Sequence, residues 1–127
     1  MEKLLGLLKF NDKGLIPAII QDEKSKEVLT LCYLNREALV KTLEEGFVYV
    51  FRRSKNILMK KGETSGCVQA LRSLSIDCEG NSILLKVDQK IAGCHEGYFT
   101  CYFRQVDKVG NVKIIGERLF DPKKVYK

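Results

Sequence analysis

A hairpin signal in the middle of the chain constrains the fold more than any other feature. Apolar and polar residues alternate through Cys67–Glu79 and again through Ser82–Lys90, and the segment Glu79-Gly80-Asn81 lies between these two runs. A period of two residues is that of a strand, in which successive side chains point to opposite faces. Turn-forming residues between two such runs indicate an antiparallel hairpin. We therefore expect two long strands in the central sheet.

The remaining elements are predicted from similar local patterns. Asn35 suits the N-cap of a helix and Gly46 its C-terminal end. The expected elements are strands over Leu15–Gln21 and Val28–Leu34, a helix over Arg36–Glu45, and strands over Phe47–Arg53, Tyr98–Val106 and Val112–Arg118. This order predicts a strand-rich α+β domain with one main helix. The 127 residues suit a single domain, with a core at about 14–119 and a loosely held tail at 120–127.

Charge and composition narrow the class of protein. The net charge is +6 with a pI near 9.1, which favours anionic partners. No RNA-binding aromatic signature or helix-turn-helix pattern accompanies the basic residues, so we do not expect nucleic acid as the partner. No apolar run is long enough to span a membrane and no signal peptide is evident, which favours a cytoplasmic protein. Five cysteines, an odd number, fit reduced thiols and metal binding better than disulfides.

The segment from Asp77 to Cys101 holds the residues best suited to metals. It contains three of the five cysteines and the only histidine, with Cys94 sixteen residues after Cys78 and Cys101 seven further on. Thiolate and imidazole suit zinc, whereas the oxygens of Asp77, Glu79 and Asn81 suit magnesium, calcium or manganese. On a strand over Leu74–Glu79, Cys78 would face away from Asp77 and Glu79, so two metals would lie on either side. The alternative is that the cysteines are buried free thiols.

Two further segments suit the binding of an anionic substrate. Arg52 and Arg53 end a predicted strand, where they would either grip a phosphate or face solvent. The segment Lys61-Gly62-Glu63-Thr64-Ser65-Gly66 contains two glycines that let the backbone approach a ligand, with hydroxyls and a cation beside them. The residues we expect to contact substrate are Arg52, Arg53, Lys61, Glu63, Thr64 and Ser65. Taken alone, the Lys61–Gly66 segment is typical of a polar turn with no binding role.

The motifs together resemble those of the phosphoribosyl-AMP cyclohydrolases, hydrolases of histidine biosynthesis. The resemblance runs from about Gly14 to about Arg104 and is carried by LIPAIIQD at 15–22, LNREAL at 34–39, KGETSG at 61–66, DCEG at 77–80, and GCH at 93–95 with the later cysteine at 101. It implies a homodimer in which zinc is shared between subunits by Cys78, Cys94 and Cys101. It also implies magnesium at positions 77, 79 and 81.

Several positions depart from the family pattern. The acidic motif of the family has aspartates where this chain has Glu79 and Asn81, which should weaken the binding of a hard cation. Met59 and Lys60 stand in place of Trp-His, and Cys67 stands in place of another histidine. The sequence does not decide whether Cys67 replaces that histidine as a ligand or base.

The activity implied by the resemblance is the addition of water at C6 of an adenine alkylated at N1, followed by cleavage of the N1–C6 bond. Zinc would supply the hydroxide and His95 would shuttle the proton, because imidazole titrates near neutral pH. One alternative is a zinc hydrolase acting on a different purine-like or pyrimidine-like heterocycle. A third reading, ranked lower, is a zinc-stabilised module that binds nucleic acid through its basic surface.

Overall fold

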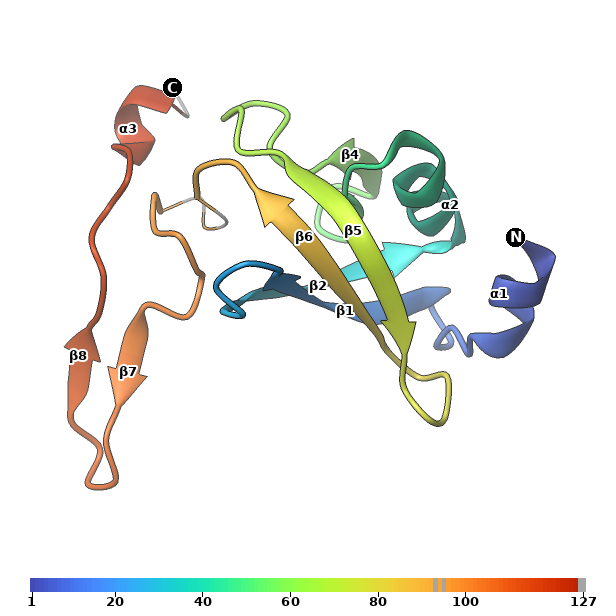
Figure 1. The fold of residues 1–127 in the computed structure, drawn as a ribbon, viewed down its shortest axis with the longest axis horizontal. Coiled ribbons are helices and arrows are strands. Elements are labelled where there is room, and N and C mark those ends of the chain that lie inside the picture. The colour runs from blue at the N-terminus through green and yellow to red at the C-terminus, as the bar shows by residue number, and fades with distance from the viewer. Residues whose placement is uncertain (93, 95, 126–127) are drawn as a thin grey trace.

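The computed structural model describes residues 1–92, 94 and 96–125 (Figure 1). Its elements are α1 (Glu2–Leu7), β1 (Leu15–Asp22), β2 (Val28–Asn35), α2 (Arg36–Glu45), β3 (Tyr49–Arg52), β4 (Ile57–Lys60), β5 (Gln69–Ile76), β6 (Ile83–Gln89), β7 (Arg104–Val106), β8 (Val112–Ile114) and α3 (Pro122–Val125). The strands form one four-stranded sheet and two small hairpins. The prediction of a strand-rich α+β domain with one main helix is confirmed.

The main sheet has the strand order β2-β1-β6-β5. It contains two antiparallel pairs, β1 with β2 and β5 with β6, and the second pair is the hairpin that the alternating pattern predicts. A parallel pairing of β1 with β6 joins them, with Ala18 opposite Ile83 and Asp22 opposite Val87. We did not predict this pairing from the sequence. It places β6 between two strands, so that one end of β6 is fixed by the turn after β5 and the other leads toward Cys94.

The core lies on one face of this sheet. Alternate residues of the two central strands point into it and are buried, namely Ile16, Ala18 and Ile20 of β1 and Ile83, Leu85 and Val87 of β6. Ala38 and Leu39 of α2 belong to the same buried cluster. Figure 1 shows α2 and the β3–β4 hairpin together on one side of the sheet. Burial of these aliphatic side chains is the main source of stability in a domain of this size.

The helix α2 begins and ends where the sequence predicts. The Asn35 side-chain oxygen accepts a hydrogen bond from the backbone N–H of Ala38 at 2.8 Å, as an N-cap should. Gly46 takes a left-handed conformation at φ 78° and donates its N–H to the Thr42 carbonyl. The buried Thr42 hydroxyl accepts a hydrogen bond from the Tyr49 N–H at 2.9 Å. This contact fixes the start of β3 against the helix.

The C-terminal third contains less strand than we predicted. Of the expected strand Tyr98–Val106 only Arg104–Val106 forms. The preceding residues form a loop in which the Tyr98 and Phe103 rings stack with their centroids 4.0 Å apart, and Thr100 and Cys101 are hydrogen-bonded to carbonyls at the start of β2. Of the expected strand Val112–Arg118 only Val112–Ile114 forms. Gly116 has φ 81°, a left-handed conformation that interrupts an extended strand.

Other boundaries also differ from the prediction. The strand expected at Phe47–Arg53 is limited to β3, and it pairs with β4, which we did not predict. The strand β5 ends at Ile76, so the expected continuation through Glu79 is wrong, and a turn begins at Asp77 instead. The helices α1 and α3 were also not predicted, and α3 lies within the segment expected to be a loose tail. No helix among the described residues is long and apolar enough to cross a membrane.

The chain after α1 packs against the turn between β5 and β6. The Lys9 N–H donates a hydrogen bond to the Gly80 carbonyl at 2.8 Å. Gly80 has φ 73°, and a β-carbon at this position would overlap the Leu7 carbonyl oxygen. Glycine is therefore required here both by the backbone conformation and by the close approach of the chain. This contact holds the turn that carries Cys78.

Candidate active site

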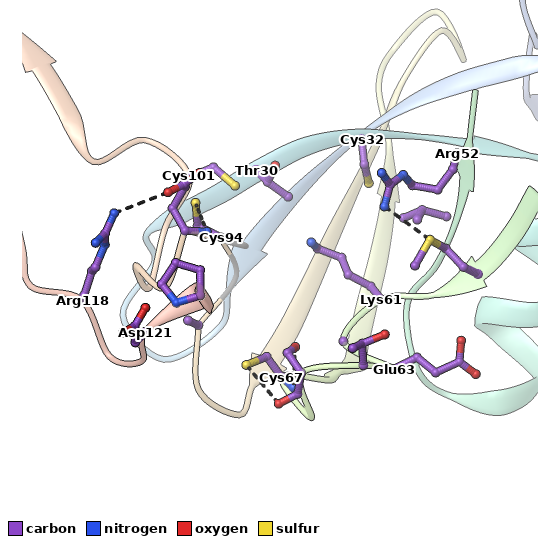
Figure 2. Close-up of a pocket in the computed structure, with 18 of the residues that line it drawn as sticks. Thr30, Cys32, Arg52, Lys61, Glu63, Cys67, Cys94, Cys101, Arg118 and Asp121 are labelled. Carbon is purple, nitrogen blue, oxygen red and sulfur yellow. Dashed lines mark hydrogen bonds and ion pairs between the residues drawn. The ribbon is translucent and has the colours of Figure 1, made fainter. Parts of the chain in front are cut away.

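A cavity of about 920 Å³ opens between the edge of the main sheet and the loops that follow β4 and β6 (Figure 2). Its walls come from four parts of the chain: β2, the β3–β4 hairpin with the loop after it, the segment around Cys94 and Cys101, and the C-terminal segment. The polar, charged and sulfur-containing side chains that line it are Thr30, Cys32, Arg52, Met59, Lys61, Glu63, Thr64, Ser65, Cys67, Cys94, Glu96, Cys101, Arg118, Asp121 and Lys123. This volume suits a small-molecule ligand.

Two of the three predicted zinc ligands meet in this cavity. Cys94 is buried, and its side chain is hydrogen-bonded to that of Cys101. Burial raises the pKa of the Cys94 thiol, the backbone N–H of Glu96 opposes this, and the neighbouring Cys101 raises the pKa further. Backbone hydrogen bonds fix both cysteines: Cys94 N–H donates to Tyr98 at 3.1 Å and Cys101 N–H to Leu29 at 2.7 Å. Two thiols held together in this way can bind one soft cation.

A buried chain of amides supports the loop that carries Cys101. The Gln69 side-chain NH₂ donates to the Gln89 side-chain oxygen at 2.7 Å, and the Gln89 NH₂ donates to the Phe99 carbonyl at 2.7 Å. Both glutamines are buried. Phe99 lies two residues before Cys101, so this chain links the core strands β5 and β6 to the thiol pair. Hydrogen bonds behind a ligand set its orientation.

The opposite wall is the Lys61–Gly66 loop predicted to contact substrate. Lys61, Glu63, Thr64 and Ser65 all line the cavity. Gly62 has φ 83°, and a β-carbon there would overlap the carbonyl group of Cys67. The loop thus requires glycine at this position. Figure 2 shows the Lys61 side chain extending into the cavity, toward the side where Cys94 and Cys101 lie.

Arg52 and Arg53 lie in different surroundings. Arg52 lines the cavity, and its Nη1 donates to the Met59 sulfur at 3.7 Å. Arg53 does not line this cavity; its guanidinium lies over the Tyr33 ring, 4.2 Å from the centroid. It borders a shallower neighbouring hollow that Arg52 also lines. Arg52 therefore borders two neighbouring spaces and Arg53 only the second of them.

Cys32 also lines the cavity, but its thiol differs from the Cys94–Cys101 pair in its surroundings. Burial raises the pKa of the Cys32 thiol to about 12, although nearby Lys61 lowers it in part. Its Sγ lies 3.8 Å from the Ala18 carbonyl, to which it donates a weak hydrogen bond. The thiol therefore stays neutral at physiological pH. A neutral thiol is a poor nucleophile.

The predicted magnesium ligands lie in the turn between β5 and β6 and do not line the cavity. Asp77 accepts hydrogen bonds from the Asn81 N–H at 2.8 Å and from the Ser82 hydroxyl at 2.9 Å. Desolvation raises the pKa of Asp77, but the hydrogen bonds from Ser82, Asn81 and Gly80 together outweigh it and lower the pKa below its usual value. Glu79 and Asn81 are exposed. The expectation that Asp77 and Glu79 share one strand face is wrong, because the strand ends at Ile76.

Cys78 is exposed in the same turn, at the opposite end of β6 from Cys94. A strand of seven residues spans about 20 Å, and β6 has seven. Two sulfurs on one zinc ion each lie about 2.3 Å from the metal. Cys78 and Cys94 of one chain therefore cannot bind the same ion. Among the residues that the structure describes, no group of three or more His, Cys, Asp or Glu side chains is arranged to hold a metal. His95, the predicted proton carrier, lies outside the described residues.

The cavity also contains residues that sequence reasoning did not assign to a site. Thr30 and Cys32 alternate along β2, and the C-terminal segment contributes Arg118, Asp121 and Lys123. The residue pattern of β2 predicts a strand, but it does not show which face of that strand borders the cavity. Arg118 pairs with Glu96 at 3.4 Å, and the Leu119 N–H donates to the Gly97 carbonyl at 2.7 Å. These contacts join segments that are far apart in the sequence, so no local sequence pattern predicts them.

An α+β domain whose cavity joins paired thiols to cationic side chains has the features of an enzyme with a small substrate. The family model described as phosphoribosyl-AMP cyclohydrolase matches residues 30–103. A phosphoribosyl-AMP cyclohydrolase of Pelotomaculum thermopropionicum is 45% identical over 122 residues, which are 96% of this chain and 95% of that protein. One from Desulforapulum autotrophicum is 52% identical, covering 94% and 98%.

A third relative, from Thermoanaerobacter pseudethanolicus, is a histidine biosynthesis bifunctional protein. It is 47% identical over 99% of this chain, which corresponds to 58% of the longer relative. The chain belongs to the phosphoribosyl-AMP cyclohydrolase family, an enzyme family of histidine biosynthesis. The resemblance carried by the sequence motifs is thereby confirmed.

Proposed function

We propose that the protein hydrolyses phosphoribosyl-AMP in a zinc-dependent reaction that opens the purine ring between N1 and C6, at a site completed by a second copy of the chain. The observation that carries this proposal is the placement of the three cysteines. Cys94 and Cys101 are in contact within the cavity, whereas Cys78 is exposed at the far end of β6. A two-fold dimer can bring Cys78 of each copy to the thiol pair of the other.

The donor chemistry fits zinc in such an assembly. Thiolates are preferred zinc ligands, and a catalytic zinc site has three protein ligands and an open position. One chain supplies two thiols in the cavity, and Cys78 of a second copy would supply the third. Cys78 is accessible to that copy because it is exposed and its turn is held by the chain after α1.

The chain's own residues would bind and orient the substrate. Lys61 and Arg52 offer cations for phosphate, and the hydroxyls of Thr64 and Ser65 offer further hydrogen bonds. When bound, zinc lowers the pKa of a water molecule toward neutrality and so supplies the nucleophile. His95 would carry the proton from this water toward the departing ring nitrogen. Cys32 would not compete as a nucleophile, because its pKa is raised to about 12.

A second, weaker cation site is proposed at Asp77, Glu79 and Asn81. Two carboxylates and one amide oxygen suit magnesium. The Asp77 oxygens already accept hydrogen bonds from Asn81 and Ser82. These bonds orient the carboxylate, but they also occupy oxygen lone pairs that a cation would otherwise use. We expect added magnesium to raise turnover, and we expect turnover to continue when only micromolar magnesium is present. Turnover measured with and without added magnesium tests this expectation.

The decisive experiment is subunit complementation. Cys78→Ser and Cys94→Ser should each abolish turnover of phosphoribosyl-AMP, followed by the ultraviolet change on ring opening. In a mixed dimer, one of the two sites combines an intact Cys78 with an intact Cys94. Random mixing of the two variants by partial unfolding and refolding should therefore restore about a quarter of wild-type activity.

The control for complementation is a mixture of Cys94→Ser with Cys101→Ser, which removes ligands from the same half of the site. No mixed dimer then contains an intact site, so activity should stay at zero. Failure of the first mixture to exceed this control would refute the shared site. Folded, zinc-loaded wild-type protein without turnover would refute the substrate assignment.

A second candidate function is favoured by one feature of the cavity. Met59 and Cys67 both line it, and both occupy positions where the family pattern has other residues. They would present a different surface to the ring of the substrate. A zinc hydrolase acting on a related heterocycle is therefore the alternative. Turnover of phosphoribosyl-AMP at a rate typical of enzymes, above about 1 s⁻¹, would exclude it as the main activity.

A further inference from the structure

A shallow, cationic hollow of about 600 Å³ adjoins the main cavity. We call it the basic bay; it is lined by Lys13, Cys32, Tyr33, Val50, Phe51, Arg52, Arg53 and Ser54. Three of these side chains are cations and none is acidic. Cys32, Val50 and Arg52 line both spaces, so the basic bay lies directly beside the cavity.

The cations of the basic bay come from two segments that the fold holds in place. Lys13 lies in the turn before β1, where the Asn11 side-chain oxygen accepts hydrogen bonds from the Lys13 N–H at 2.9 Å and the Leu15 N–H at 3.0 Å. Arg53 is stacked over Tyr33. Guanidinium groups stacked on an aromatic ring keep their N–H edges available for an anion.

We propose that the basic bay binds one of the two phosphate groups of phosphoribosyl-AMP, with Lys13 as a specificity-determining residue. This inference rests on the proposed function. The substrate carries one phosphate on its AMP part and one on its phosphoribosyl part, with the reacting ring between them. A site for it needs two separate anion subsites. The basic bay supplies one, and the Lys61–Ser65 wall of the cavity supplies the other.

Charge balance distinguishes the basic bay from the cavity. The cavity lining has four cations and three carboxylates, namely Arg52, Lys61, Arg118 and Lys123 against Glu63, Glu96 and Asp121. The basic bay has three cations without a carboxylate. A dianionic phosphate is stabilised more by the second arrangement, because no like charge opposes it. Arg52, which lines both spaces, would lie along the path between the ring and this phosphate.

Lys13 is the residue that makes the inference testable. It precedes the segment 30–103 that the family model matches. It is exposed, and only its backbone takes part in the Asn11 turn contacts. Lys13→Ala therefore removes a charge without disturbing the fold. Lys3→Ala is the matched control, since Lys3 is an exposed lysine of α1 that does not line either space.

The first readout is steady-state kinetics with phosphoribosyl-AMP. Lys13→Ala should raise KM about tenfold with kcat within about twofold, as expected when a uniform binding contact is lost. Lys13→Arg should restore most of the affinity, because the charge is kept. Lys3→Ala should match wild type. A KM for Lys13→Ala equal to that of Lys3→Ala, or a fall in kcat alone, would overturn the inference.

The second readout needs no turnover. AMP and ribose 5-phosphate each carry one of the two phosphates and lack the N1-alkylated ring that the reaction opens, so their binding to the zinc-loaded protein is measured by calorimetry. Lys13→Ala should weaken one of these ligands about tenfold and leave the other unchanged. Equal weakening of both, or of neither, would refute the basic bay as a single-phosphate subsite. If wild-type protein shows no turnover but Lys13→Ala still weakens one ligand selectively, the basic bay is upheld and the proposed function fails.

Discussion

The buried pair Gln69 and Gln89 gives the sharpest prediction for stability. Gln89 makes two side-chain hydrogen bonds at 2.7 Å, one accepted from Gln69 and one donated to the Phe99 carbonyl. Gln69 makes only the first, and its own side-chain oxygen is buried without a hydrogen-bond partner in the described part of the chain. Replacing each residue by leucine, which has a similar volume, should therefore have unequal effects. Gln89→Leu should be the more destabilising substitution.

The expected magnitudes follow from the groups left without partners. Gln89→Leu leaves the Gln69 NH₂ and the Phe99 carbonyl unpaired, and each buried polar group of this kind costs about 1–3 kcal/mol. The loss should be about 2–5 kcal/mol, since the Phe99 carbonyl is only partly buried. Gln69→Leu leaves only the Gln89 oxygen unpaired and removes an unpaired acceptor, so about 1–2 kcal/mol is expected. The double substitution leaves only the Phe99 carbonyl unpaired.

Urea unfolding at one fixed protein concentration and with a metal chelator present measures these differences without contributions from zinc or from dimerisation. We expect the free energy of unfolding to fall in the order wild type, Gln69→Leu, Gln89→Leu. The double variant should be more stable than Gln89→Leu alone, which a double-mutant cycle reports as coupling. Equal losses for the two single variants, or a double variant less stable than Gln89→Leu, would refute the reasoning.

Three other predictions concern the loop at Lys61–Gly66, Asp22 at the end of β1, and the metal. Gly62→Ala should lower turnover at least tenfold, because the added methyl group would overlap the Cys67 carbonyl. Gly66→Ala is the control: Gly66 has a similar φ of 78° but open space around it, so this substitution should cost only about 1–2 kcal/mol of stability. Both variants are compared by kcat and by urea unfolding. Burial raises the pKa of Asp22, but hydrogen bonds from Ser25 prevail and lower it. Its stabilisation is therefore present above the unfolded pKa and lost as pH falls through the folded value, so the stability difference between wild type and Asp22→Asn should shrink below about pH 4 in acid titrations. Chelation of zinc should abolish turnover and shift the protein toward monomer in light scattering, and readdition of zinc should reverse both; a chelated protein that stays dimeric and active would contradict the shared site.

The parts of the fold that could be predicted are those with local signals. Alternating apolar residues around Gly80 predicted β5 and β6, and Asn35 with Gly46 predicted both ends of α2. Each of these patterns acts within a few residues. The parallel pairing of β1 with β6 joins residues more than sixty positions apart, and no local pattern encodes it.

The errors have a similar origin. Tyr98–Val106 is rich in aromatic and β-branched residues, which favour a strand, yet the Tyr98 and Phe103 rings stack on each other and the Thr100 hydroxyl bonds to the Val28 carbonyl at 2.7 Å. Tertiary contacts override strand propensity in such a segment. The same reason explains why Lys13, Cys32 and Arg118 were not assigned to a site. Their neighbours in space are remote in sequence.

The strand signal on its own already limited where zinc could bind. Cys94 follows Cys78 by sixteen positions, a spacing that a compact loop could close. The alternation of Ile83, Leu85 and Val87 instead requires that seven of these residues be extended. An extended strand cannot bring its two ends together, so one pattern predicts both the sheet and the separation of the cysteines. If the three thiols bind one ion, the pattern that builds the core of each chain also makes each chain depend on a second copy.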